Sequence, residues 1–191
     1  MLRLFVAIPL PEIVRTDLAE LCSGLPGAKW VDSENMHLSL RFIGEVGRRD
    51  ADEIHHMLAR VNSPAFDLVV AGVGCFESGR KIRTLWAGVE KQRLLYRLRE
   101  KVEAAVVRTG AEPSRRKFKA HITLARFKNG TSPRIGTFVE NHDCFRSGPF
   151  RIDHFSLFQS HLGSGRAYYE MLAEYPLQNE DLNSGSEYAQ Q

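Results

Sequence analysis

Two short apolar runs in this sequence repeat one pattern, and that repeat constrains the fold more strongly than any other feature. The first run holds His37 with Ser39, and the second, later in the chain, holds His121 with Thr123. Residues i and i+2 of a β-strand point to the same face, so each run predicts a strand with an imidazole and a hydroxyl on one face and aliphatic side chains on the other. We therefore expect a fold in which the polar faces of two such strands meet at one cleft.

The remaining segments predict a mixed set of strands and helices, because hydrophobic periodicity and the positions of glycine and proline mark the ends of each element. The expected strands span residues 2–8, 36–43, 66–73, 82–89, 119–127, 150–160 and 167–177, and the expected helices span residues 11–23, 50–61, 91–109 and 133–141. Several strands follow one another directly, which favours an α+β fold with two largely antiparallel sheets flanked by helices. Each histidine run follows a strand and a helix, which suggests a duplicated half.

The size and composition of the chain are typical of an ordinary globular protein, with 191 residues of which 43% are hydrophobic and 26% are charged. This length suits a single domain, which we place at residues 1–177, and the polar stretch 178–191 is expected to be a flexible tail. The first apolar run is broken by Pro9 and Pro11 too early for a signal peptide or a membrane span. We therefore expect a cytoplasmic protein without a membrane partner, and the sequence gives no reason to expect more than a monomer.

The cysteines and the surroundings of the histidines argue against a disulfide framework or a metal site. Cys22, Cys75 and Cys144 are odd in number and far apart, so free thiols in a reducing compartment are expected. Neither His37 nor His121 has a carboxylate or a thiol at ligand spacing beside it. The sequence therefore predicts neither a bound metal nor another cofactor.

Positive charge clusters around the second histidine run. Lysine and arginine number 26 against 23 acidic residues, and this formal net charge of +3 by itself only permits a polyanionic partner. The local cluster is more informative, because it flanks His121 on both sides: Arg115, Arg116, Lys117, Lys119, Arg126 and Lys128. A basic run alone is usually a solvated loop. Beside the histidine pattern, it favours a phosphate-bearing ligand.

Two imidazoles and two hydroxyls on one face suit phosphate-ester chemistry. One neutral imidazole removes a proton from the attacking water, and the other, protonated, gives a proton to the leaving oxygen. The hydroxyls and a nearby arginine hold the phosphate oxygens. A single triplet is weak support, because His154 with Ser156 has the same spacing, lacks basic neighbours and is interpreted as structural. The hypothesis therefore depends on the pair.

The two motifs and several other segments resemble the 2H phosphoesterase superfamily, in particular its bacterial and archaeal RNA 2',3'-cyclic phosphodiesterases. His37-Leu-Ser39-Leu and His121-Ile-Thr123-Leu are similar to the two H-x-[S/T]-x motifs of that superfamily. The likeness extends to further segments: the opening RLFVAIP, Trp30-Val31, the RFIG after the first motif, LWAGV at residues 85–89, and Arg126. It covers nearly the whole chain up to about Leu177.

This resemblance implies a bilobal α+β fold with the active site in a central cleft, and metal-independent hydrolysis of a terminal 2',3'-cyclic phosphate on RNA to a 2'-phosphate. His37 matches the proton donor to the departing 3' oxygen, and His121 matches the proton acceptor that activates water. Ser39, Thr123 and Arg126 match the phosphate-binding positions. The family often has threonine where this chain has Ser39, so the hydroxyl is kept but the stiffness of a β-branched side chain is lost. RNA ends or cyclic nucleotides are the implied substrates.

The sequence leaves the identity of the phosphate-binding arginine open. Arg126 lies five residues after His121, so strict alternation puts it on the opposite face of the strand. Either a bulge or the end of the strand re-aims it, or Arg41, which shares parity with His37, takes its place.

The aromatic residues near the motifs and the function itself also have alternatives. Phe42 and Phe118 are the candidates for stacking on a nucleobase, as in many proteins that bind single-stranded RNA. Strict alternation puts Phe42 on the face opposite His37 and so favours core packing for it, whereas Phe118 lies within the basic loop. One other function is an RNA-end or nucleotide-binding module that has lost catalysis. A further one is an ATP-independent 2'-5' RNA ligase that joins tRNA halves.

Overall fold

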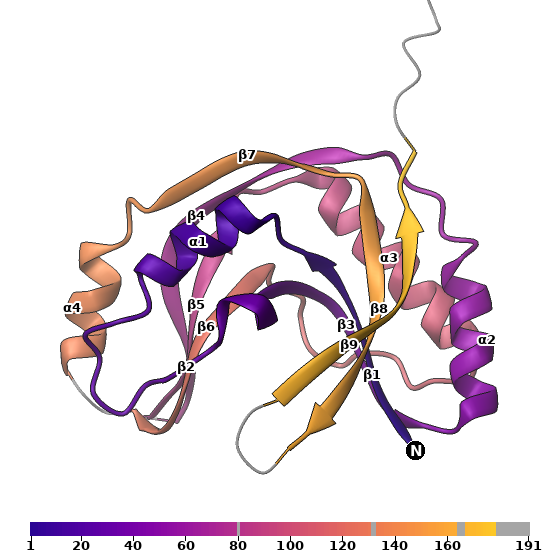
Figure 1. The fold of residues 1–191 in the computed structure, drawn as a ribbon, viewed down its shortest axis with the longest axis horizontal. Helices are drawn as coiled ribbons and strands as arrows, with labels where there is room; N and C mark the ends of the chain where they lie inside the picture. Colours follow the sequence, from indigo (N-terminus) through magenta and orange to yellow (C-terminus); the bar gives the residue numbers. More distant parts are fainter. Residues whose placement is uncertain (80, 131–132, 164–166, 179–191) are drawn as a thin grey trace, which may run out of the picture.

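The computed structural model describes residues 1–79, 81–130, 133–163 and 167–178 of the chain, and Figure 1 shows its helices and strands. The strands are β1 (Leu2–Pro9), β2 (Lys29–Trp30), β3 (His37–Val46), β4 (Phe66–Ser78), β5 (Lys81–Val89), β6 (His121–Gly130), β7 (Arg146–Ile152), β8 (His154–Leu162) and β9 (Ala167–Pro176). The helices are α1 (Glu12–Glu20), α2 (Arg48–Leu58), α3 (Arg93–Arg108) and α4 (Pro133–Asn141), with a short 3-10 helix η1 (Ser33–Asn35) before β3.

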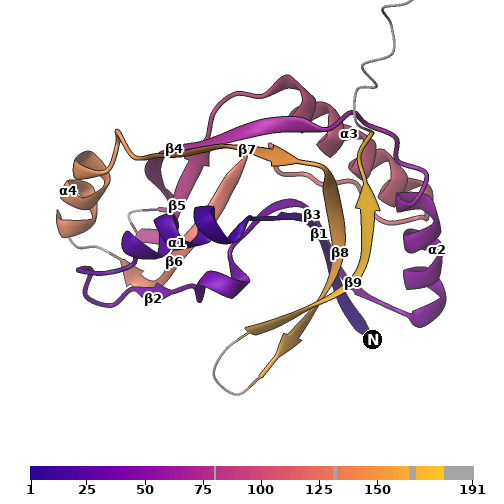
Figure 2. The ribbon, with the colours of Figure 1, turned by 45° about the horizontal axis from the view of Figure 1, so that its top comes forward.

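The strands form one open antiparallel sheet in the order β7-β4-β5-β6-β3-β1-β8-β9, with β2 paired to β6. Its two halves meet between β6 and β3, where the registered pair is Leu38 and Ile122. Figures 1 and 2 show β4, β5 and β6 on one side of the molecule and β1, β3, β8 and β9 on the other. The α+β fold is confirmed, and the two expected sheets are the two halves of one continuous path.

Each half contains a strand–helix–strand unit whose second strand carries a histidine motif. The units are β1-α1-β3 and β5-α3-β6, and the two strands of each unit are antiparallel neighbours. Helices α2 and α3 pack together against the half that contains β3, whereas α1 and α4 lie beside β7 and β4 of the other half. This arrangement fits the duplicated half suggested by the sequence.

The aliphatic residues of the two motif strands belong to the hydrophobic core. Leu38 and Ile122 are fully buried, as are Leu95 and Leu98 on helix α3. Because alternate side chains of a strand point to opposite faces, the motif histidines lie on the face away from Leu38 and Ile122. Burial of the apolar face therefore fixes the strand register and with it the direction of the histidines.

The segment near the end of the chain differs from the expected single strand at residues 150–160. The chain forms β7 and β8 instead, and the break falls at Asp153. Strand β7 pairs with β4, whereas β8 pairs with β1 in the other half of the sheet. The apolar alternation changes parity at this point, from Phe150 and Ile152 to Phe155 and Leu157, but this change alone does not reveal the new pairing partner. The expected closing hairpin is confirmed as β8 and β9.

The described chain ends just inside the predicted tail. Gln178, the first residue of that tail, makes backbone hydrogen bonds with Ser63 and Ala65, and residues 179–191 lie outside the described part. None of the helices in the described residues combines the length and the apolar character needed to cross a bilayer. The three cysteines are free thiols.

Candidate active site

The two histidine motifs lie side by side where the halves of the sheet meet. Strands β3 and β6 are antiparallel, with Leu38 paired to Ile122. Continuing that register by one residue in each direction sets His37 opposite Thr123, and Ser39 opposite His121. Directly opposed residues of a strand pair share a face, so both imidazoles and both hydroxyls lie on the same face of the sheet.

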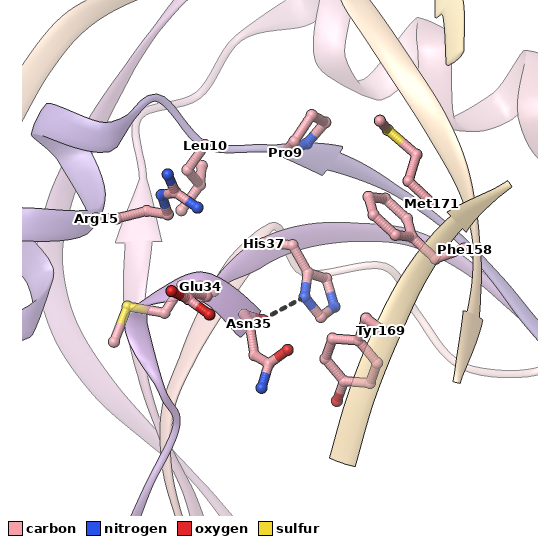
Figure 3. A pocket seen from close by; sticks show the side chains of 10 residues that line it. Pro9, Leu10, Arg15, Glu34, Asn35, His37, Phe158, Tyr169 and Met171 are labelled. Atoms are coloured by element: carbon pink, nitrogen blue, oxygen red, sulfur yellow. Dashed lines mark hydrogen bonds between the residues drawn. The ribbon is translucent and has the colours of Figure 1, made fainter. Parts of the chain in front are cut away.

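Both imidazoles are oriented by the same backbone interaction. The Nδ1 atom of His37 lies 2.7 Å from the carbonyl oxygen of Asn35, and Figure 3 marks this hydrogen bond with a dashed line. Nδ1 of His121 lies 2.7 Å from the carbonyl oxygen of Lys119. A carbonyl oxygen only accepts, so Nδ1 of each ring carries the proton and donates. In the neutral rings Nε2 is therefore the unprotonated nitrogen, available as a base.

A register shift in β6 returns Arg126 to the histidine face. Opposite β5, the partners step from Thr123 to Ala125 while β5 advances by a single residue, so Leu124 is extra. An extra residue reverses the alternation beyond it, and Arg126 then points to the same side as the motif residues. Its positive charge lowers the pKa of both motif histidines, so the guanidinium is within electrostatic reach of both rings.

A second register shift, in β3, has the opposite effect on Arg41. Opposite β1, the partners step from Ser39 to Arg41 while β1 advances by a single residue, so Leu40 is extra. Arg41 therefore leaves the histidine face, and Phe42 joins it. Phe42 is 51% exposed and stacks on Phe5 with ring centroids 5.6 Å apart. Core packing of Phe42, which strict alternation favoured, is thus not what the structure has.

Arg41 and Phe118 are both engaged with helix α3. Arg41 forms an ion pair with Glu103, Nε to carboxylate oxygen 3.2 Å, and donates a hydrogen bond to the carbonyl of Glu112. Phe118 is partly buried against the core, with its ring beside Tyr96 and under the guanidinium of Arg99. The structure therefore brings together His37, Ser39, His121, Thr123, Arg126 and Phe42, and it holds Arg41 and Phe118 against the helix.

Burial lowers the pKa of both motif histidines. The pKa of His37 falls to about 4, because burial disfavours its charged form and the positive charges of Arg126 and His121 add to this. The pKa of His121 is lowered by burial, with the charges of Lys119 and Arg126 as further causes. The hydrogen bond at Nδ1 acts in the opposite direction in each case. Both rings are therefore neutral at pH 7 in the ligand-free protein.

Comparison with known proteins identifies the family. A family model described as "LigT like Phosphoesterase" matches residues 8–86 and 88–169, which is most of the chain. The chain belongs to the LigT-like phosphoesterase family. Both histidine motifs fall within the matched residues.

Relatives and solved structures are similar to this LigT-like phosphoesterase over most of its length. An RNA 2',3'-cyclic phosphodiesterase of Archaeoglobus fulgidus is 32% identical over 162 residues, which cover 83% of this chain and 91% of that protein. One of Thermotoga maritima is 33% identical over 179 residues, or 91% of this chain and 94% of that protein. The structure of E. coli LigT complexed with 3'-AMP superposes with a TM-score of 0.76 at 27% identity, covering 92% of this chain and 98% of that one.

Aromatic rings surround each histidine of this LigT-like phosphoesterase. The ring centroid of His37 lies 4.9 Å from that of Phe5 and 5.3 Å from that of Tyr169. The ring centroid of His121 lies 4.8 Å from that of Phe76, and Trp86 is a further neighbour. Sequence reasoning assigned none of the four to the site, because each lies in another strand. Phe5 and Trp86 fall within segments that resemble the family, whereas the only signal for Phe76 and Tyr169 is the apolar character of their strands.

Lys119 is a second feature that the motifs did not reveal. Its Nζ atom lies 4.0 Å from the ring centroid of Trp86, and its charge is one of the causes of the lowered pKa of His121. Its own backbone carbonyl accepts the hydrogen bond from that imidazole. Lys119 therefore acts on His121 both through the main chain and through its ammonium group.

The third histidine triplet has a different environment. Nδ1 of His154 lies 2.6 Å from the carboxylate of Asp153, and Nε2 lies 3.5 Å from that of Glu174. Both of its nitrogens thus have acidic neighbours, which fits a structural role. Within the residues that the structure describes, no group of three histidine, cysteine, aspartate or glutamate side chains is arranged to hold a metal ion.

Proposed function

We propose that this protein hydrolyses the terminal 2',3'-cyclic phosphate of RNA to a 2'-phosphate, with His37 as the acid, His121 as the base and no metal ion. The observation that carries this proposal is the pair of oriented imidazoles on one face of adjacent strands, with a guanidinium within electrostatic reach of both. The activity named for the relatives in Archaeoglobus fulgidus and Thermotoga maritima supports the same reaction.

The reaction uses the free Nε2 atom of each ring. Nε2 of His121 takes a proton from a water molecule as the water oxygen attacks phosphorus. The bond between phosphorus and the 3' oxygen breaks, and Nε2 of the protonated His37 gives its proton to that oxygen. The products are a 3'-hydroxyl and a 2'-phosphate, and solvent takes the proton that His121 gained and returns one to His37. One imidazole must therefore be charged and the other neutral when substrate is bound.

Substrate binding itself supplies the charged ring. In the ligand-free protein the pKa of His37 is about 4, so this ring is neutral at pH 7. An anionic phosphate beside the ring favours the imidazolium and raises that pKa. His37 is thus protonated when the phosphate binds, and it then holds the proton that the 3' oxygen receives.

The remaining residues of the site hold the phosphate. Ser39 lies opposite His121 and Thr123 lies opposite His37 in the continued register, so each hydroxyl has an imidazole across from it. Hydroxyl groups and a guanidinium donate to phosphate oxygens, and they stabilise the charge that develops on them during the reaction. We assign this role to Ser39, Thr123 and Arg126.

The test is turnover of an RNA oligonucleotide that ends in a 2',3'-cyclic phosphate, measured in the presence of EDTA. We expect a 2'-phosphate product, and a fall in kcat of about 10²–10⁴-fold in His37→Ala and in His121→Ala, the range for loss of one acid or base. His154→Ala is the matched control, because it changes a histidine with the same H-x-S spacing outside the site.

Two results contradict the proposal. The first is full activity in either motif variant. The second is a wild-type protein that binds the RNA but yields no product with or without EDTA, which is the behaviour of a binding module.

A further inference from the structure

A row of apolar side chains crosses the half of the sheet that holds His37. Strand pairing sets Phe42 opposite Phe5, Phe5 opposite Phe158, and Phe158 opposite Met171. Directly opposed residues share a face, so this row runs along the histidine face from β3 to β9. The rings of Phe5 and Phe158 are stacked, with centroids 5.2 Å apart and planes 14° from parallel. The row thus forms a flat apolar floor beside the catalytic imidazole.

A cavity of about 200 Å³ lies at the end of this floor, lined by His37, by residues of the last hairpin and by Arg15 and Glu34. Figure 3 shows Tyr169, Phe158 and Met171 on one side of His37, and Arg15 and Glu34 on the other. Sites for whole drug-sized ligands are larger, roughly 300–1,000 Å³. This volume therefore suits a single planar ring system.

The lining of this cavity combines apolar walls with a polar rim. Met171 is 52% exposed although it is apolar, and Tyr169 meets the His37 ring edge-on. Arg15 offers donors at the rim and Glu34 offers acceptors. A nucleobase has the matching character, because it presents two apolar faces for stacking and an edge of donors and acceptors.

The proposed reaction fixes which part of the substrate lies here. His37 protonates the 3' oxygen, and this oxygen belongs to the ribose of the terminal nucleotide. The ribose and its base must therefore lie on the His37 side of the phosphate, whereas the attacking water lies on the His121 side. The cavity is on the side where the base has to be.

We propose that this cavity is the subsite for the nucleobase of the terminal nucleotide, with Tyr169 and Met171 as its contact residues. The inference rests on the proposed function, because the position of the ribose follows from the role of His37. The residues proposed to contact the base therefore lie on the closing hairpin of β8 and β9, and not at Phe118, which is engaged with helix α3.

The experiment compares two substrates that differ only in the base. One is adenosine 2',3'-cyclic phosphate, and the other is methyl β-ribofuranoside 2,3-cyclic phosphate, which has the same ring phosphate and no base. We expect a KM for the nucleotide that is lower by ~5–100-fold in the wild type, the range for stacking of one base. Tyr169→Ala and Met171→Ala should raise KM for the nucleotide and leave KM for the compound without a base in place, and Tyr169→Phe should restore the KM for the nucleotide.

Tyr168→Ala is the matched control, because Tyr168 precedes Tyr169 on β9, points to the other face and is 64% exposed. Equal effects of Tyr169→Ala on both substrates overturn the subsite, since a base contact cannot act on a substrate without a base. A selective rise in KM in Phe42→Ala, with none in Tyr169→Ala and Met171→Ala, overturns it too and places the base at the other end of the row.

Binding measurements separate this inference from the proposed function. If the wild type hydrolyses neither substrate, the proposed function fails, and calorimetry with adenosine 2'-phosphate and methyl riboside 2-phosphate still tests the cavity. Tighter binding of the adenosine compound in the wild type but not in Tyr169→Ala supports a base subsite in a binding protein. Equal affinities overturn the subsite.

Discussion

At the scale of single residues, the site depends on how each imidazole is held. In both motifs the carbonyl two residues before the histidine accepts the proton of Nδ1, from Asn35 in one copy and from Lys119 in the other. This shared contact follows from the strand entry that the two motifs have in common. The surroundings differ, because the charge of Lys119, whose ammonium group lies over Trp86, lowers the pKa of His121, whereas the charges that lower the pKa of His37 are those of Arg126 and His121. The two imidazoles are therefore tuned differently although their motifs match.

The charge of Lys119 should set the acid limb of the pH profile. Its charge lowers the pKa of His121, so Lys119→Met should raise that pKa and move the rising limb of kcat/KM to higher pH. Lys119→Arg should keep the limb in place, because it keeps a positive charge at the same position. The measurement is kcat/KM for a 2',3'-cyclic nucleotide from pH 4.5 to 9. Lys128→Met is the control, since this exposed lysine lies farther along β6. An acid limb that stays at the same pH in Lys119→Met would refute the role of the Lys119 charge.

At the scale of elements, two bulges decide which arginine reaches the site. Strict alternation predicts Arg41 on the histidine face and Arg126 off it, and the extra residues Leu40 and Leu124 reverse both. Sequence alone does not give this result, because a bulge depends on the register with the neighbouring strand. The motif residues were predictable since they precede the bulges. The positions beyond them were not.

Substitution of the two arginines should therefore have opposite consequences. Arg126→Ala removes an exposed guanidinium near both histidines, so KM should rise by ~10–100-fold, the value of a charge-assisted hydrogen bond, with little change in stability. Arg41→Ala removes a partner of Glu103, so it should lower the free energy of unfolding by about 1–3 kcal/mol and leave KM nearly unchanged. Kinetics and urea unfolding of both variants provide the measurement. A rise in KM in Arg41→Ala without loss of stability goes against this assignment.

At the scale of the whole molecule, local patterns predicted the elements better than their partners. The helix expected at residues 133–141 coincides with α4, because periodicity within a segment reports its own conformation. The expected strand at residues 150–160 divides into β7 and β8, which the sequence marks only by a change of apolar parity at Asp153; the crossing between the halves of the sheet depends on tertiary pairing and was not predictable. The cavity beside His37 was hidden for the same reason. Tyr169 reaches that imidazole from the last strand, and only the tertiary arrangement brings them together.

Joining the halves of the sheet around a buried imidazole should make the stability of the whole protein sensitive to acid. The pKa of His37 is about 4 in the folded protein and about 6.5 when the chain is unfolded. Between these values the unfolded state binds a proton that the folded state does not, so the stability is fully present above pH 6.5 and is lost as the pH falls toward 4. The loss due to this residue is at most about 3 kcal/mol.

The measurement is urea unfolding of the wild type and of His37→Gln at pH 7.5, 6, 5 and 4.5. The free energy of unfolding of the wild type, relative to that of the variant, should decrease steadily as the pH is lowered. A constant difference between the wild type and His37→Gln would show that this imidazole is not shielded from water in the folded protein.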